Sequence, residues 1–403
     1  MRRTTWSSAI RPRASGFRVH NIAPQKTQIV MLAGERGEKM FKLHVVQAEY
    51  GDCLILECGT GSKSTHILVD GGPAGTYQRH LRKLLGNIKE RGGRLDLTIL
   101  SHVDDDHVAG LLELMTDLQE QSETVKISAL WHNAFSQTIG SGIETRLGMR
   151  LAAASTARRV MTMTDSVTFS IRQGDQLKSA ATALGIPINS GFSNDLVSLD
   201  GAPHQPIEVG DLRLYVVGPT KKSLGELEKK WDEWLRKYRE SRLVFDPILA
   251  SKVDRSIPNL SSIMVVAEME GKRVLLAGDG LCAHLIKGLG QVNLLRSDGT
   301  FHVDVLKVPH HGSVRNVSRD FFKKVTADKY VISANGEDGN PDLATLIWIV
   351  EAAKDQRRTI EILVTNETSS TRQLVEEYDP DKYGYRLIEM DKESDSMPLQ
   401  IEA

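Results

Sequence analysis

The sequence of 403 residues has few cysteines and no long apolar run, and both facts limit what the chain can be. The three cysteines, Cys53, Cys58 and Cys282, are an odd number without the paired spacing of a zinc ribbon. We therefore expect a reducing, cytoplasmic environment and assign the thiols no chemistry. No stretch approaches the roughly 18 uninterrupted apolar residues of a membrane span, so the sequence predicts neither a channel nor a transporter and no membrane association.

The chain also lacks an excess of charge of either sign. Lysine and arginine number 51, aspartate and glutamate number 52, and the formal net charge is -1. Such a chain has no global attraction for nucleic acid, so any contact with a phosphate backbone must come from a local patch. The overall charge neither supports nor excludes a nuclease.

Acidic residues are missing from the first 18 residues, MRRTTWSSAIRPRASGFR. This composition is typical of an organelle transit peptide or of an upstream extension, and we favour an extension because the patterned sequence begins only near Met40. Residues 1–39 are therefore expected to be disordered or an extension. Residues 40–403 contain no low-complexity linker, which predicts one large domain with helical insertions near 143–184 and 223–242.

From Phe41 onward, short β-rich runs are followed by segments with helical periodicity. The first half contains KLHVVQA, CLILEC, HILVDGG, LTILS and ISALWH as expected strands, with helical spacing in YQRHLRKLLGNIKER and VAGLLELMTDLQEQ. The second half repeats the strand pattern in LRLYVVGPT, SIMVVAE, RVLLAGD, DVLKVPHH, YVISAN and EILVTN. Two similar β-rich halves predict an α/β fold with two stacked sheets and helices outside.

Several of these strands end on a histidine or an aspartate. The hexad HVDDDH, residues 102–107, follows LTILS; the other strand endings are Asp70, Asp279, and the pair His310 and His311. Side chains just beyond strand ends project where sheet edges meet, so these groups can converge although the sequence separates them. The pattern predicts a hydrolase with two metal ions.

Spacing within the hexad divides it between two ions. His102 and Asp104 are alternate residues of an extended loop and point the same way, whereas Asp106 and His107 enter the helix that follows and face another direction. Asp279 comes from a distant strand and is the natural bridge, because each of its oxygens can bind one ion. One residue of the HHGS loop, His310 or His311, would complete the second site.

These motifs resemble the metallo-β-lactamase-fold hydrolases, whose signature is a His-x-His-x-Asp-His loop with later aspartate and histidine ligands. Within that superfamily the chain is most similar to the soluble hydrolase domain of competence DNA-uptake (ComEC-like) proteins. The shared features are EYGDC, LVDGG, SHVDDDHVAGL, a strand ending in GD, and LKVPHHGS. The resemblance covers roughly Phe41 to the C-terminal strands and implies an αββα sandwich of two mixed sheets with the metals at one edge.

The resemblance also implies a role for each site residue. Asp70 corresponds to the family's buried aspartate, which orients ligands without touching the metal. The positions that match metal ligands are His102, Asp104, Asp106, His107, Asp279 and one of His310 and His311.

The chain departs from the family pattern in two places. Many members have another histidine between the hexad and the bridging aspartate, and only His132, His204 or the polar Asn259 are available in this interval. His132 is the better histidine because it ends an expected strand, although a structural histidine explains it equally well. Asn340, in GNPD, stands where the competence-type domains have the histidine of Gly-His-Pro.

Asp104 stands where many members have histidine, and an oxygen ligand there shifts the preference of the first site from zinc toward manganese. We expect two divalent ions, Zn or Mn, that activate a water and stabilise charge on the attacked group. Asp106 or a neighbouring carboxylate would orient the nucleophile, and His310 or His311 would protonate the leaving oxygen.

Three functions remain open on the sequence alone. The first is a phosphodiesterase or nuclease that acts on DNA or RNA. The second is a small-molecule hydrolase acting on a cyclic nucleotide, phosphoester, lactone or thioester, and the third is a catalytically weak metal-binding regulatory module. The basic residues that would bind phosphates in a nuclease are Lys307, Arg315, Lys323, Lys324 and those of the helix from Lys229 to Arg242.

Overall fold

The computed structural model describes residues 39–60, 64–120, 124–134, 164–227, 229 and 258–401. The expected N-terminal extension, apart from Lys39, lies outside these residues. So do the first part of the expected insertion at 143–184 and most of the one at 223–242. The described residues at 164–183 of the first expected insertion form α4 (Thr164–Ala183).

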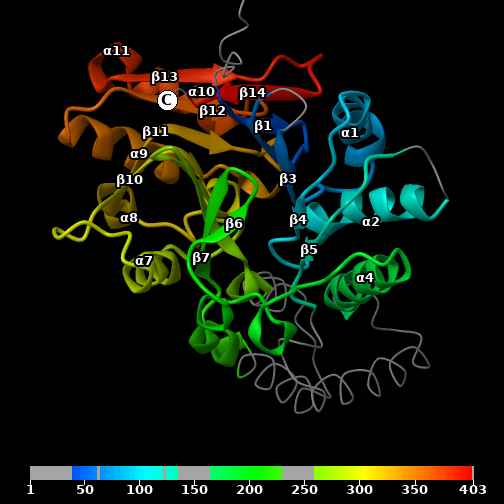
Figure 1. Cartoon of the computed structure of the whole chain (residues 1–403). Helices are drawn as coiled ribbons and strands as arrows, with labels where there is room; N and C mark the ends of the chain where they lie inside the picture. Colours follow the sequence, from blue (N-terminus) through cyan, green and yellow to red (C-terminus); the bar gives the residue numbers. More distant parts are fainter. Residues whose placement is uncertain are drawn as a thin grey trace, which may run out of the picture. The chain divides into compact units, whose positions relative to one another are not determined.

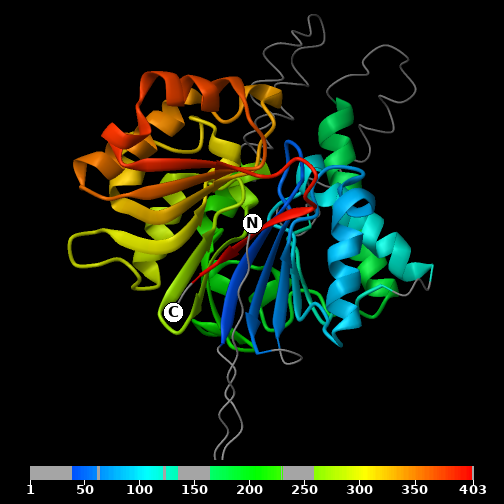
Figure 2. The same cartoon turned by 90° about the horizontal axis from the view of Figure 1, so that it is seen from above.

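One sheet contains strands from the first half of the chain and one strand from its C-terminal end. Its outer strand β14 pairs antiparallel with β1, so a late segment closes the sheet beside the first one (Figure 2). The pairs β3–β4 and β4–β5 are parallel and the others antiparallel, which makes the sheet mixed. In spatial order the strands are β14 (Ser396–Gln400), β1 (Met40–Val46), β2 (Leu54–Gly59), β3 (Thr65–Val69), β4 (Leu97–Ile99) and β5 (Leu130–Trp131).

The second sheet contains strands from the second half of the chain. Strands β9 to β13 run parallel to one another, and β6 to β9 form an antiparallel meander. In spatial order the strands are β13 (Tyr385–Glu389), β12 (Ile360–Val364), β11 (Val325–Ile332), β10 (Phe301–Lys307), β9 (Lys272–Leu276), β8 (Met264–Met269), β7 (Leu212–Gly218) and β6 (Ile207–Val209).

Three apolar layers hold these elements together. A central layer, which includes Leu43, Leu56, Val265 and Val305, lies between the facing surfaces of the two sheets. A second layer joins the first sheet to its helices, and a third joins the second sheet to its own (Figures 1 and 2). The helices over the first sheet are α1 (Arg82–Glu90), α2 (Asp105–Gln119) and α4; those over the second are α7 (Cys282–Gln291), α8 (Arg319–Lys324), α9 (Leu343–Asp355), α10 (Ser369–Glu377) and α11 (Pro380–Tyr383).

This arrangement confirms the predicted αββα sandwich of two mixed sheets, and it follows from the side-chain pattern. Along β8, Val265 and Ala267 face the central layer while Val266 faces the helices, as the two-residue period of a strand requires. A sheet with both faces buried needs apolar residues at nearly every position, and β8 reads MVVAEM. Among the described residues no helix is long and apolar enough to cross a membrane.

Candidate metal centre

The acidic hexad lies where β4 passes into α2. The strand ends at Ile99, Asp104 is the extended residue before the helix, and α2 begins at Asp105. The prediction that Asp106 and His107 lie at a helix N-terminus is therefore confirmed. Gln173 of α4 donates a 2.7 Å hydrogen bond to Asp105, so the described part of the insertion reaches the outer side of this loop.

Asp70 lies just beyond β3 and holds the neighbouring histidine by hydrogen bonds. Its φ of 59° is a conformation that few residues other than glycine, asparagine and aspartate adopt, and it directs the buried carboxylate at the end of β4. The carboxylate accepts hydrogen bonds of 2.7 Å from both the amide and the hydroxyl of Ser101. It also lies 2.9 Å from Nδ1 of His107, so His107 donates through Nδ1 and keeps the lone pair on Nε2.

The two histidines after β10 occupy a strained loop. His310 and His311 have φ values of 49° and 53°, and the amide of His310 donates to the carbonyl of Gly278 in the turn after β9. Nδ1 of His311 donates to the carbonyl of Ser333 at 2.8 Å, and Nδ1 of His310 donates to Oδ1 of Asn316 at 2.6 Å. Each ring is thus fixed through Nδ1 and directs Nε2 elsewhere, as metal-bound histidines do.

Asp279 lies between four imidazoles, two at each carboxylate oxygen. Oδ1 is 3.5 Å from Nε2 of His107 and 3.7 Å from Nε2 of His311. Oδ2 is 3.7 Å from Nε2 of His102 and 3.6 Å from Nε2 of His310. The two oxygens of one side chain therefore belong to two different sets of nitrogen donors.

One further carboxylate joins each set. Asp104 lies 3.4 Å from Nε2 of His102, and Asp106 lies 3.6 Å from His107 and 3.3 Å from His311. These distances are too long for hydrogen bonds, but ligands bound to one tetrahedral ion at about 2.0 to 2.1 Å lie roughly 3.3 to 3.4 Å apart. We call the two sets the His102 group (His102, Asp104, His310 and Oδ2 of Asp279) and the His107 group (Asp106, His107, His311 and Oδ1 of Asp279).

Burial leaves several of these atoms without a hydrogen bond. Nε2 of His102, His107 and His311 and Oδ1 of Asp279 are inaccessible to solvent and have no hydrogen-bond partner within the described part of the chain. A buried polar atom without a partner costs roughly 1 to 3 kcal/mol. Three of these atoms, Nε2 of His107, Nε2 of His311 and Oδ1 of Asp279, face one another and form a polar cradle that a cation fits.

The charges of the cluster also favour a bound cation. Burial alone would lower the pKa of a histidine, but Asp106, Asp279 and Asp70 outweigh it and raise the pKa of His107 well above its ordinary value. Burial would also lower the pKa of His311, but Asp52 and Asp279 outweigh it and raise this pKa to about 10. The carboxylates thus create a demand for positive charge, which a proton on the imidazole or a divalent cation beside a neutral imidazole can meet.

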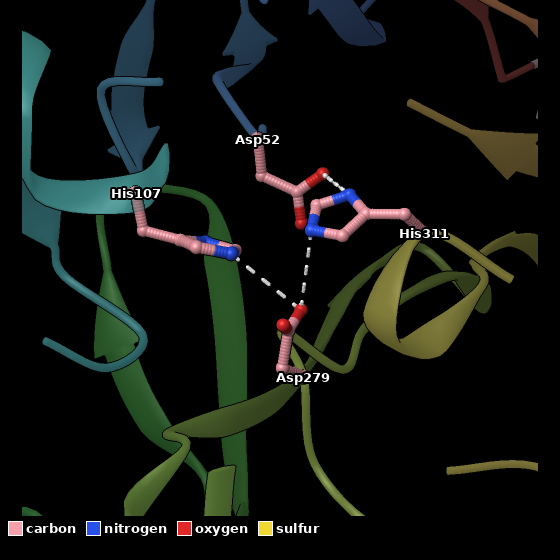
Figure 3. A group of neighbouring side chains, drawn as sticks. All are labelled: Asp52, His107, Asp279 and His311. Carbon is pink, nitrogen blue, oxygen red and sulfur yellow. Dashed lines mark ion pairs between the residues drawn. The ribbon is translucent and has the colours of Figure 1, made fainter. Parts of the chain in front are cut away.

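The structure adds Asp52 to the site and gives Lys307 another role than the one expected from the sequence. Asp52, from the turn between β1 and β2, lies 3.4 Å from Nδ1 of His311 (Figure 3). It also forms an ion pair with Lys307. Burial would raise the pKa of Asp52, but Lys307 and His311 hold it well below the ordinary range. Asp52, His107, Asp279 and His311 each offer a ligand atom within 4.8 Å of the others. The GD turn of EYGDC was the only sequence signal for Asp52.

Lys307 does not serve as a phosphate contact. Its side chain is 1% exposed and paired with Asp52, so the expectation that it grips a phosphate is wrong. A lysine at the end of a buried strand is covered by the neighbouring sheet, which its sequence context did not reveal. Lys323 and Lys324 end α8, directly before β11 begins, and therefore lie at the sheet edge opposite the strand ends that carry the cluster.

The other candidates take different positions. His132 is buried and bonds to the carbonyl of Gly174 at 3.1 Å through Nε2, and its backbone bonds to Asn189; neither partner belongs to the cluster. His204 is exposed. Asn259 is buried, with its amide nitrogen 3.2 Å from Nδ1 of His310, so it lies behind that ring. Asn340 is partly exposed in the loop that precedes α9.

Comparison with known proteins agrees with this geometry. Residues 47–139, which include Asp52, Asp70 and the hexad, match the family model of the metallo-beta-lactamase superfamily. No curated protein matches the chain. The family match supports the superfamily, and together with the aspartate and histidine cluster it suggests a metal-dependent hydrolase that binds divalent metal.

Proposed function

We propose that the chain is a phosphodiesterase that hydrolyses nucleic acid, DNA or RNA, with two divalent ions, zinc or manganese. The observation that carries the proposal is the position of Asp279, whose two oxygens each face two imidazole nitrogens. A single ion would need one such set, whereas a pair of ions needs a carboxylate shared in this way. The likeness to competence-type domains favours a nucleic acid substrate.

The His102 group would hold one ion and the His107 group the other. In this proposal His310 supplies the imidazole that the family pattern otherwise places between the hexad and the bridging aspartate, while His132 stays structural. Asp104 and Asp106 give each ion an oxygen ligand besides the shared Asp279, which suits manganese as well as zinc. Asp70, Ser333 and Asn316 fix the rings of His107, His311 and His310 from behind.

When bound, paired divalent ions lower the pKa of a water and stabilise charge on a phosphoryl oxygen. The protein contributes a fixed arrangement around that chemistry. Asp106 is 24% exposed and lies at the solvent side of its group, where its second oxygen can orient the attacking water. His310, 17% exposed, is the more accessible of the two loop histidines; it would either hold an ion or protonate the leaving oxygen.

A group of lysines supports an extended, anionic substrate. Lys221, Lys222 and Lys287 line a surface cavity of about 660 Å³ together with Thr220, directly after β7. Strands β7 and β9 are both antiparallel to β8, so they run the same way and end at the same edge of the sheet. With strands about 4.8 Å apart, the end of β7 lies on the order of 10 Å from the strand that leads to Asp279. An extended polymer bound at Asp279 would follow this sheet edge toward the lysines.

Metal analysis and a substrate panel test the proposal. Purified protein is expected to bind two divalent ions per chain and, loaded with that metal, to cleave single-stranded DNA, RNA or both. Asp279→Asn should lose both ions and all turnover, whereas Asp304→Asn on β10 should keep them. If the protein hydrolyses only cyclic dinucleotides or other small esters, it is a small-molecule hydrolase. If it binds metal but hydrolyses none of the substrates, it is a regulatory module.

The lysines give a second test that separates polymers from small substrates. Lys222→Glu with Lys287→Glu should weaken binding of single-stranded DNA roughly tenfold or more at low salt and flatten its salt dependence, since each phosphate contact contributes a slope of about -0.7. Hydrolysis of a generic small phosphodiester should not change. Lys323→Glu with Lys324→Glu at the opposite sheet edge is the matched control. Wild-type protein without salt-sensitive DNA binding would count decisively against a nuclease.

A further inference from the structure

The ion pair between Asp52 and Lys307 is buried, crosses between the two sheets, and has no part in the proposed hydrolysis. Both side chains are 1% exposed. Asp52 belongs to the β1–β2 turn of the first sheet, and Lys307 is the last residue of β10 in the second. Stability alone does not explain such a pair, because a buried ion pair is often no better than apolar residues of similar volume.

The contacts of Asp52 suggest what the pair does. One carboxylate oxygen, Oδ2, faces the ammonium group of Lys307, and the other, Oδ1, lies 3.4 Å from Nδ1 of His311. The ring of His311 therefore lies between Asp52 on its Nδ1 side and Asp279 on its Nε2 side (Figure 3). Lys307 thus fixes the carboxylate of Asp52 whose other oxygen lies on the Nδ1 side of the His311 ring.

The backbone of the same turn contacts the opposite side of the cluster. The amide of Asp52 donates to the carbonyl of Asp106 at 3.2 Å. The carbonyl of Gly51 accepts a 2.6 Å hydrogen bond from the hydroxyl of Ser333, whose own carbonyl holds Nδ1 of His311. The turn thus contacts Asp106 of the first sheet directly and is linked through Ser333 to His311 of the second.

We propose that Asp52 and Lys307 are a positioning pair that fixes His311 against Asp106 and so sets the metal affinity of the His107 group, with Asp52 not itself a ligand. The inference rests on the proposed metal centre. Partners that orient metal-bound histidines typically change metal affinity roughly 10- to 100-fold when they are removed. The His102 group has no contact with the pair among the described residues and should keep its affinity.

The test is a titration of metal-free protein with Co²⁺, whose visible absorption reports the geometry of its ligands. The double variant Asp52→Asn with Lys307→Met removes both charges together, since either single change would leave a buried charge unpaired. Wild-type protein should bind two ions. The double variant should bind one ion as before and the second roughly 10- to 100-fold more weakly, with an altered absorption band for that second ion.

A conservative variant and a matched control separate positioning from general stability. Asp52→Glu keeps the charge pair but presses a longer side chain toward His311, so it should fold and still weaken the second ion. Glu268→Gln with Arg273→Met removes another ion pair of the second sheet, on the β8–β9 hairpin, and should leave both affinities unchanged.

The outcomes distinguish the inference from the proposed function. If the wild type binds no metal, both are wrong. If it binds two ions and both Asp52 variants bind them unchanged, only the positioning role is wrong. If the variants lose affinity for both ions equally, the positioning role is also wrong, because the Asp52–Lys307 pair would then support the whole site. Should the double variant fail to fold, the Co²⁺ affinity of Asp52→Glu decides by itself. If an Asp52 variant saturated with Co²⁺ lacks the absorption band of the second ion, Asp52 is a direct ligand and the positioning role is wrong.

Discussion

The imidazoles of His310 and His311 are adjacent in the chain yet face different oxygens of one carboxylate. Nε2 of His310 is 3.6 Å from Oδ2 of Asp279, and Nε2 of His311 is 3.7 Å from Oδ1. Two consecutive left-handed residues make this possible, because they turn the second ring away from the first. The sequence left open which of the two binds metal; in the proposed centre both do, in different groups.

Replacement of each histidine by glutamine should therefore remove a different ion. His310→Gln should bind one ion per chain with the His107 group intact, and His311→Gln should bind one with the His102 group intact, because each loses one of four donors. Metal content after dialysis measures this. His302→Gln, on the same strand β10 but paired with Thr326, should keep two ions.

The alternative role of His310 gives a different result. If His310 is only the proton donor, His310→Gln would keep two ions and lose rate mainly on substrates with poor leaving groups. Two retained ions in both variants would contradict the division of donors between the two groups.

His132 should make the fold sensitive to acid. Burial lowers its pKa to about 4, so between pH 6.5 and 4 the unfolded chain takes up a proton that the native protein does not. Above pH 6.5 the ring is neutral in both states and contributes nothing. Below it the free energy of unfolding falls by about 1.4 kcal/mol per pH unit, to a total of about 3 kcal/mol near pH 4.

Urea unfolding across this range measures the effect. His132→Gln should lose less stability between pH 6.5 and 4 than the wild type, whereas the exposed His204→Gln should follow the wild type. Parallel curves for all three proteins would mean that His132 is not the titrating group.

At the scale of elements, the β1–β2 turn has almost no freedom. A Cβ on Gly51 would lie 2.0 Å from the carbonyl oxygen of Asp106 and 2.7 Å from a ring carbon of Pro73. Only glycine permits the turn to approach the start of α2 this closely. The turn and the hexad are therefore one packed unit, although about fifty residues separate them.

Gly51→Ala should consequently disturb the site as well as the fold. Overpacking of this kind costs roughly 1 to 3 kcal/mol. Displacement of Asp106 should also weaken one ion, measured by titration with metal. Gly86→Ala is the control: a Cβ there meets nothing within 4 Å inside α1, so it should raise stability by up to about 1 kcal/mol and leave metal binding unchanged. Unchanged metal affinity in Gly51→Ala would show that the turn tolerates movement.

Local patterns predicted most elements and the convergence of the ligands. Buried strands such as β8 read as largely apolar runs. Parallel strands such as β9 and β10 end at a common edge, so Asp279, His310 and His311 could be placed together in advance. The late strands β13 and β14 were not predicted, because YRLIE and SMPLQ carry little apolar signal. In addition, β14 pairs with β1 from the other end of the described chain, which no local pattern shows.

Pairings between sheets escaped prediction for a similar reason. Lys307 looked like a surface cation, and nothing local shows that a turn some 250 residues earlier supplies Asp52. The role of His310 depended on the backbone of the loop, since two left-handed histidines in succession have no sequence signature. The contacts between the two sheets are therefore the features of the site that only the structure shows.

At the scale of the whole domain, the two groups of donors join the two halves of the sandwich. The hexad comes from the first sheet, and Asp279, His310 and His311 come from the second, so neither half holds a complete group. Links between the sheets here include the amide of Ile263, which donates to the carbonyl of Ser101 at 2.8 Å, the hydroxyl of Ser333, which donates to the carbonyl of Gly51, and the Asp52–Lys307 pair. An ion in either group binds the folded chain and has no equivalent site in the unfolded one.

Metal should therefore stabilise the fold, in proportion to the logarithm of its concentration. A free metal concentration 1,000 times the Kd adds about 4 kcal/mol to the free energy of unfolding for each ion, so removal with a chelator should lower the Tm by several degrees and re-addition should restore it. Thermal unfolding monitored by circular dichroism measures the shift. Asp279→Asn removes the ligand that both groups share and should show no metal-dependent shift, while His302→Gln should respond as the wild type does. A full metal response in Asp279→Asn would mean that the stabilising ion binds outside the two groups.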